Sequence, residues 1–190
     1  ESFAKEREAI RGFVQMPSGD FLISSDKGIF LFSEKHNTIT ALYKNLPFTI
    51  IRKGQVLLSR SGYIWMAQEN KGIVKWKPGT NDYTIYKVPP VSGDSSDSPR
   101  WFNHFFEDSK GNIWFQTSNG IGVFIDSKNS ALNFNYYKNG AASFPIGTNS
   151  FAEDKKGRVW LTGNDGWMGY TLSFDPTKGV VHKFNIKERG

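Results

Sequence analysis

A repeated pattern is the feature of this sequence that most constrains its fold. The stretch 107–120, EDSKGNIWFQTSNG, combines a polar turn, a short apolar run around Trp114 and a second turn that ends in glycine. The same order of residue types occurs three more times, in QMPSGDFLISSDKG from Gln15, LSRSGYIWMAQENKG from Leu58 and EDKKGRVWLTGNDG from Glu153. We therefore expect a repeat protein.

The spacing of the turn glycines indicates which kind of repeat this is. The glycines of the first turn are Gly19, Gly62, Gly111 and Gly157, so successive copies lie 43, 49 and 46 residues apart. The glycine of the second turn follows after 9, 10, 9 and 9 residues, at Gly28, Gly72, Gly120 and Gly166. A variable period around a fixed inner spacing indicates loops of different length around a constant hairpin. Strand-rich repeats of roughly 40 to 50 residues with periodic Gly and aromatic residues are typical of β-propeller blades.

We therefore predict an all-β chain of four four-stranded antiparallel blades, a single β-propeller portion that belongs to a larger propeller. The expected blades span approximately 9–45, 47–88, 100–138 and 144–187. A polar insertion with two prolines at its start, residues 89–99, separates the second blade from the third. No helix of useful length is expected.

The tryptophans and glycines of the repeat have structural explanations. Ile113 and Trp114 are consecutive strand residues and so face opposite sides of a sheet, each toward a neighbouring blade. We therefore expect the repeat tryptophans in inter-blade packing. The turn glycines supply the positive φ of tight hairpins. The string GNDGWMG, residues 163–169, lacks the strand-to-helix setting of a phosphate loop and is interpreted as a turn.

Composition excludes several function classes. The chain of 190 residues contains no cysteine, which rules out disulfides, Cys-ligated metals and thiol catalysis. Its formal net charge of +6 is dispersed over single Lys and Arg residues, without the basic stripe that nucleic-acid binding needs. No run approaches the roughly 18 apolar residues of a membrane span, so no direct membrane contact is expected from this segment. A signal peptide is also absent, as it would be from a mature fragment.

The two best copies of the repeat resemble the two-component regulator propeller repeat. The resemblance rests on Asp108, Gly111, Trp114, Thr117 and Gly120, and on Asp154, Gly157, Trp160, Thr162 and Gly166. It is weaker in the second copy, where Ala67 replaces Thr, and weakest in the first, which has Leu22 in place of Trp. Such repeats build the periplasmic sensor regions of hybrid two-component system histidine kinases that regulate polysaccharide use. The resemblance implies the propeller fold and a periplasmic sensor role, and it transfers no catalytic residue.

The residues themselves give little support to catalysis and more to binding. The three histidines, His36, His104 and His182, fall in different blades, so no catalytic, metal or cofactor site is predicted. Propellers bind ligands where the loop entering each inner strand meets the turn between the second and third strands. Amide, carboxylate and Trp groups there suit a sugar, whose hydroxyls need paired partners and whose C–H faces stack on aromatic rings. The predicted ligand-binding residues are Arg100, Trp101, Asn103, His104, Asn119, Asn164, Asp165 and Trp167.

The leading hypothesis is a non-catalytic periplasmic sensor propeller that binds, or helps to bind, an oligosaccharide. The alternatives are a protein-interaction scaffold and a propeller lyase or hydrolase. An open arc of four blades would expose two apolar blade faces. We therefore expect those faces to be covered by the remaining blades of the same propeller, by closure into a small ring, or by a second copy.

Overall fold

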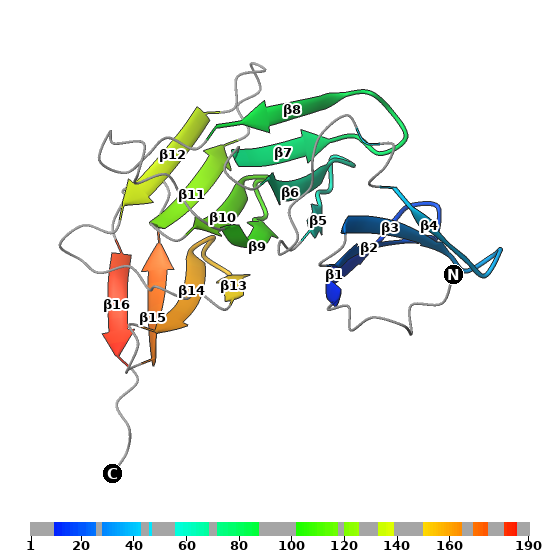
Figure 1. Cartoon of the computed structure of the whole chain (residues 1–190). Coiled ribbons are helices and arrows are strands. Elements are labelled where there is room, and N and C mark those ends of the chain that lie inside the picture. The colour runs from blue at the N-terminus through cyan, green and yellow to red at the C-terminus, as the bar shows by residue number, and fades with distance from the viewer. Residues whose placement is uncertain are drawn as a thin grey trace, which may run out of the picture. The chain divides into compact units, whose positions relative to one another are not determined.

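The computed structural model confirms the predicted all-β architecture of four-stranded antiparallel blades (Figure 1). The structure describes residues 10–25, 28–42, 46, 56–68, 72–87, 102–117, 120–125, 133–138, 150–164, 169–174 and 181–185. Every regular element among them is a strand, and each sheet follows the chain order of its strands. The chain divides into two compact units, residues 1–88 and 89–190, each of which contains two sheets.

The first unit contains sheets one and two. Sheet one consists of β1 (Ile10–Gln15), β2 (Phe21–Ser25), β3 (Gly28–Ser33) and β4 (Thr38–Ala41). Sheet two consists of β5 (Val56–Leu58), β6 (Ile64–Gln68), β7 (Gly72–Trp76) and β8 (Tyr83–Tyr86).

The second unit contains sheets three and four. Sheet three consists of β9 (Phe102–Glu107), β10 (Ile113–Thr117), β11 (Gly120–Ile125) and β12 (Asn133–Lys138). Sheet four consists of β13 (Ser150–Glu153), β14 (Val159–Asn164), β15 (Gly169–Phe174) and β16 (Val181–Asn185). The blade limits predicted from the sequence extend beyond these strands into residues that are not described, and they stay predictions.

The first turn of every sheet has the same backbone. Its glycine has a φ of 91° in sheet one, 81° in sheet two, 87° in sheet three and 74° in sheet four, in the left-handed region that favours glycine. In each sheet the glycine N–H donates to the carbonyl three residues earlier, which belongs to Met16, Ser59, Asp108 or Asp154. These four residues are therefore equivalent, and the copies are aligned from this point.

A core between the sheets forms in each unit. In the first unit, Leu22 and Ile29 of sheet one pack with Ile64, Met66 and Trp76 of sheet two. In the second unit, Trp114, Ile121 and Val123 of sheet three pack with Val159 and Leu161 of sheet four. The predicted packing role of Trp114 is confirmed, since its side chain is fully buried in this core.

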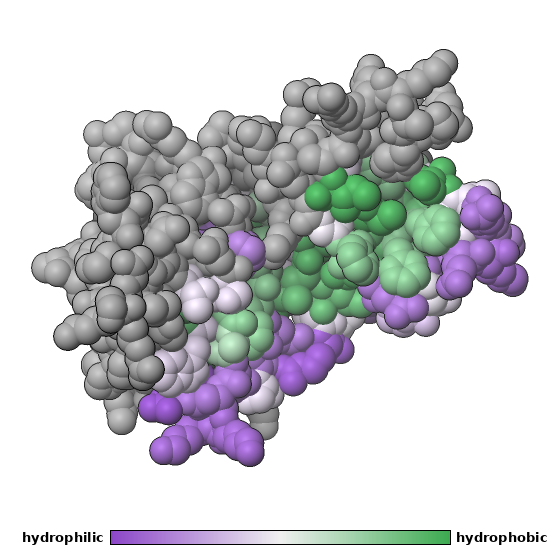
Figure 2. All heavy atoms as spheres, turned by 90° about the horizontal axis from the view of Figure 1, so that it is seen from below, coloured by the Kyte–Doolittle hydropathy of each residue, from purple (hydrophilic) through white to green (hydrophobic). Residues whose placement is uncertain are grey.

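The other face of sheet one is apolar and exposed. Phe13, Phe21 and Phe32 lie in a row across β1, β2 and β3, with neighbouring ring centroids 6.2 and 6.4 Å apart. Phe13 is 68% exposed, and Ile39, opposite Phe32 on β4, is 49% exposed. Figure 2 shows apolar atoms gathered over this sheet beside hydrophilic turns. We call this surface the apolar face of sheet one.

The equivalent positions in sheet two are covered. By the turn alignment, Phe21 and Phe32 of sheet one correspond to Ile64 and Trp76 of sheet two, and both sets are paired across adjacent strands. Ile64 is 0% and Trp76 is 5% exposed, because this face of sheet two packs against sheet one. The apolar face of sheet one thus has the composition of an inter-blade surface.

Candidate functional site

His104 is the predicted site residue whose side chain the structure describes. It lies in β9 between Asn103, which pairs with Gln116, and Phe105, which pairs with Phe115. His104 is therefore the extra residue of a β-bulge, and its φ is 38°, an uncommon value for a residue other than glycine. Bulges re-aim side chains and are over-represented next to functional sites.

The environment of His104 favours a neutral imidazole. The side chain is partly buried, and this burial lowers its pKa from the ordinary value of 6.5. A neutral imidazole presents one hydrogen-bond donor and one acceptor, which matches the hydroxyl groups of a polar ligand.

Two further predicted residues lie at the corresponding end of their sheets. Asn103 is beside His104 near the start of β9, and Asn164 ends β14, where it pairs with Gly169. In an antiparallel blade the first strand begins where the second strand ends, so the backbones of Asn103 and Asn164 lie at the same end of their sheets. We call this end, which is opposite the first turns, the loop-bearing end of the second unit. Inner strands β9 and β13 of the two sheets contact each other. The remaining predicted residues, Arg100, Trp101, Asn119, Asp165 and Trp167, lie outside the described part of the chain.

At the other end of sheet three, Asp108 organises the first turn. One carboxylate oxygen, Oδ1, accepts the backbone N–H of Lys110 at 3.0 Å and that of Asn112 at 2.9 Å. The other, Oδ2, accepts Nδ2 of Asn112 at 2.7 Å and the indole Nε1 of Trp114 at 2.9 Å. Asp108 is 3% exposed, so these four donors replace the water that it loses on folding.

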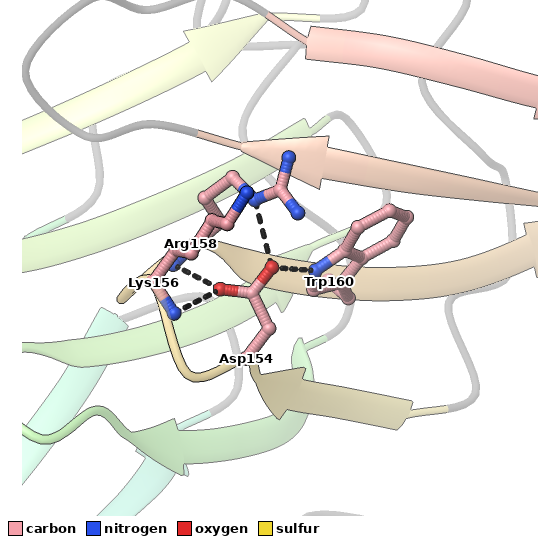
Figure 3. A network of polar contacts seen from close by, with 4 residues as sticks. All are labelled: Asp154, Lys156, Arg158 and Trp160. Atoms are coloured by element: carbon pink, nitrogen blue, oxygen red, sulfur yellow. Dashed lines mark hydrogen bonds and ion pairs between the residues drawn. The ribbon is translucent and has the colours of Figure 1, made fainter.

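Asp154 makes the same arrangement in sheet four (Figure 3). Its Oδ1 accepts the backbone N–H groups of Lys156 and Arg158, at 2.9 and 3.1 Å. Its Oδ2 accepts Nε1 of Trp160 at 2.8 Å and Nε of Arg158 at 2.7 Å. The bond from the Trp160 indole, followed by the bonds from Arg158 and Lys156, holds the pKa of this carboxyl well below its ordinary value.

We call this arrangement the Asp–Trp turn. Sequence reasoning assigned the tryptophans to packing and missed the hydrogen bonds that join them to the carboxylates. The signal was present, since Asp, Gly and Trp follow each other at intervals of three in 108–114 and in 154–160. Each carboxylate oxygen accepts two hydrogen bonds from the turn, so these aspartates have a structural role in it.

A polar link joins sheets three and four next to these turns. The Glu153 carboxylate, at the end of β13, accepts the backbone N–H of Ser109 at 2.6 Å and its hydroxyl at 2.7 Å. The link holds the first turn of one blade against the inner strand of the next. Within the part of the chain that the structure describes, no group of three or more His, Cys, Asp or Glu side chains is placed to hold a metal ion.

Comparison with known proteins places these features in a family context. Residues 96–119 match the family described as Two component regulator propeller, which confirms the resemblance predicted from the motif. A search of curated protein sequences found no match. The described ranges contain no helix that could span a membrane.

Solved structures with a similar fold include sensor domains. One extracellular domain of a putative hybrid two-component system from B. thetaiotaomicron has a TM-score of 0.65 at 14% identity, over 95% of this chain and 25% of its own. A second such domain from B. thetaiotaomicron has a TM-score of 0.59 at 21% identity, over 80% of this chain and 20% of its own. The chain therefore spans a quarter and a fifth of the lengths of these two sensor domains.

The fold is also shared with a protein named as an enzyme. A putative 6-phosphogluconolactonase from Bacteroides uniformis has a TM-score of 0.59 at 13% identity, over 93% of this chain and 53% of its own. Identities at this level show the shared fold and leave function to the site.

Proposed function

We propose that this chain is part of a non-catalytic sensor propeller of a hybrid two-component system, located in the periplasm, that binds or helps to bind a glycan-derived ligand. The observation that carries the proposal is the match of residues 96–119 to the two-component regulator propeller repeat. The likeness of nearly the whole chain to extracellular domains of two such systems supports it. Signalling follows if the ligand binds one receptor arrangement more tightly than another.

The loop-bearing end of the second unit is the proposed ligand surface. The bulge at His104 points to a position that is specialised beyond regular strand geometry. A partly buried imidazole, which in its neutral form has one hydrogen-bond donor and one acceptor, suits the hydroxyl groups of a sugar. The opposite end is occupied by the two Asp–Trp turns, whose polar groups are committed to the fold.

Isothermal titration of the chain with a panel of oligosaccharides tests this proposal. We expect saturable binding of at least one of them, with affinity reduced about tenfold or more in His104→Ala, as loss of a ligand hydrogen bond predicts. The control is Lys110→Ala, an exposed residue of the first turn at the opposite end, which should bind as the wild type does. No binding to any glycan, or equal loss in both variants, would overturn the glycan assignment.

A lactone hydrolase is the second candidate, favoured by the likeness to the putative 6-phosphogluconolactonase. Incubation of the chain with sugar lactones, followed by titration of the released acid, distinguishes it from a sensor. Turnover that disappears in His104→Ala would replace the sensor proposal with an enzyme. A scaffold role would instead show as a protein partner that binds without any sugar.

We also propose that the apolar face of sheet one packs against a further blade of the same propeller. Its counterpart in sheet two, the surface that carries Ile64 and Trp76, is buried in this way. Alone, the 190-residue chain should bind a fluorescent hydrophobic dye and self-associate without fixed stoichiometry. Phe13→Lys should reduce both effects, whereas Tyr83→Lys, an exposed ring of β8, should not. A discrete dimer of the chain would contradict this and assign the face to a second copy.

A further inference from the structure

The first unit contains a cavity that includes none of the predicted ligand-binding residues. It has a volume of about 610 Å³ and lies between the first turn of sheet one and the β7–β8 hairpin of sheet two. Its walls include Leu22, Leu31 and Leu42 from the side of sheet one and Trp76 from sheet two. Cavities that bind small organic molecules measure roughly 300 to 1,000 Å³ and have largely apolar walls.

The cavity is located where the first turn departs from the Asp–Trp turn. Met16 occupies the position of Asp108, as the matching hydrogen bonds of Gly19 and Gly111 show. Six residues later, Leu22 occupies the position of Trp114. Both Met16 and Leu22 line the cavity. Sheet one therefore lacks the indole, and the carboxylate that receives it, at the place where the cavity opens.

A carboxylate nevertheless lines this cavity from the same turn. Asp20 belongs to the lining, and its Oδ2 accepts the Ser18 hydroxyl at 3.0 Å. The Trp76 indole, by contrast, donates to the Thr80 carbonyl at 3.1 Å, and the Thr80 hydroxyl donates to the Lys77 carbonyl at 2.8 Å. These wall donors are used within the protein. The cavity thus combines leucine and tryptophan walls with polar side chains, namely Ser18, Thr80, Asn81 and the carboxylate of Asp20.

We propose that this cavity binds a small aromatic molecule that carries an N–H donor, of the indole class. The ring lies against the leucines and Trp76, and its N–H donates to the Asp20 carboxylate. The ligand reproduces, from solution, the indole-to-carboxylate contact that Trp114 and Trp160 make within the Asp–Trp turns.

Occupancy has a mechanical consequence for the first unit. The walls come from both sheets, so a bound ring contacts sheet one and sheet two at once. A ligand that binds the folded state alone raises its stability as concentration exceeds the dissociation constant. An indole-class ligand would therefore stabilise the packing of sheet one against sheet two. This site is independent of the proposed glycan surface, and its failure would leave that proposal unchanged.

Titration with indole and with benzofuran tests the site, because benzofuran has the same shape without the N–H donor. Nuclear magnetic resonance of leucine methyl groups in the 190-residue chain is the measurement. We expect saturable shifts at the cavity leucines on adding indole, and about tenfold weaker binding of benzofuran, the value of one charge-assisted hydrogen bond. Absence of saturable shifts with indole would overturn the proposal, and equal affinity for benzofuran would overturn the role of Asp20.

Variants distinguish the contribution of Asp20 to indole binding from that of the apolar walls. Asp20→Asn should reduce indole affinity toward that of benzofuran, while Asp82→Asn, an acidic residue of the same unit outside the cavity lining, should leave it unchanged. Met16→Asp combined with Leu22→Trp introduces the residues of the Asp–Trp turn and should abolish binding. If that double variant does not fold, Leu31→Phe narrows the cavity from another strand and should weaken binding too. Full indole affinity in a folded cavity-filling variant would contradict the proposal.

Discussion

The two units close the same turn in different ways. In the second unit an aspartate, Asp108 in sheet three and Asp154 in sheet four, accepts hydrogen bonds from backbone N–H groups and side chains. One of these bonds comes from a tryptophan indole. In the first unit Ser59 takes that position in sheet two. Its hydroxyl accepts the Tyr63 N–H at 3.2 Å and bonds the Tyr63 carbonyl at 3.0 Å. The backbone is common to all four turns, so glycine and main-chain bonds set the turn, whereas the side-chain hydrogen bonds within it differ between the units.

The neighbouring tryptophans show the same contrast. Trp114 and Trp160 donate to carboxylates, whereas Trp65 of sheet two is stacked on Tyr86, with centroids 6.0 Å apart and planes at 16°. Lys75 Nζ lies 5.6 Å from the Trp65 ring and 4.2 Å from the Tyr63 ring. Trp114 and Trp160 of the second unit are thus held by hydrogen bonds to carboxylates, whereas Trp65 of sheet two is held by stacking and a nearby cation.

The largest expected difference is between Asp108→Ala and Ser59→Ala. Asp108→Ala leaves buried donors, the Trp114 indole and the Asn112 amide among them, without their acceptor, which should lower the free energy of unfolding by about 2 to 4 kcal/mol. Ser59→Ala removes a hydroxyl and should cost about 1 kcal/mol. Urea denaturation followed by tryptophan fluorescence measures both. Equal losses would show that the carboxylate adds nothing beyond what the backbone turn supplies.

The contacts between blades give a second, smaller contrast. Ser109 and Glu153 are linked by two hydrogen bonds in the second unit, but the equivalent positions of the first unit are Pro17 and Leu58. Leu58 instead packs into the core between sheets one and two. A double-mutant cycle of Ser109→Ala and Glu153→Ala should give a coupling free energy of about 1 kcal/mol or less, since the pair is exposed. The exposed Lys155, changed to Ala, should show no coupling to Ser109.

Sequence reasoning succeeded where one residue type determines one local geometry. The turn glycines and the alternation around Trp114 were enough to predict the blades and their packing. It missed the hydrogen bonds that Asp108 and Asp154 accept from tryptophan. A carboxylate meets an indole six residues later only when the turn between them closes in the right way. The bulge at His104 depends on register across two strands and has no signature in composition.

The cavity in the first unit was missed for a related reason. Leu22 was noted as a departure from the repeat, but its effect on volume depends on side chains from β3 and sheet two. Of the predicted ligand residues, the structure describes the side chain of His104 and the backbones of Asn103 and Asn164. Their joint role as a glycan surface stays a prediction.

Acid should affect the turn of sheet four and leave that of Ser59 unchanged. Because hydrogen bonds lower the pKa of Asp154 below its ordinary value of 3.8, its contribution to stability is fully present above that value. It decreases as the pH falls from about 4 toward the lower pKa of the folded state. Urea denaturation between pH 7 and pH 3 should show a smaller loss for Asp154→Asn than for the wild type. Ser59→Ala should retain the wild-type pH dependence, and a parallel decline in all three proteins would contradict the assignment.

The smallest expected effect concerns two residues other than glycine with positive φ, one in each unit. Asn37, with φ 50°, lies in the β3–β4 turn of the first unit, and asparagine tolerates this conformation well. His104, with φ 38°, holds a similar backbone within a strand of the second unit and is also partly buried. Its stabilising effect as a neutral group is present above the ordinary pKa of 6.5 and decreases as the pH falls through and below that value, since the unfolded state takes up the proton first.

His104→Asn keeps a side chain suited to positive φ and removes the titration. The variant should match the wild type near pH 8 and exceed it in stability near pH 5, by a small margin because the imidazole is partly exposed. Denaturation midpoints at the two pH values measure this, and Asn37→Ala is the control that changes backbone strain without changing any titrating group. If His104→Asn differed from the wild type equally at both pH values, the effect would come from backbone strain, and the bulge would contribute to stability through conformation rather than through charge.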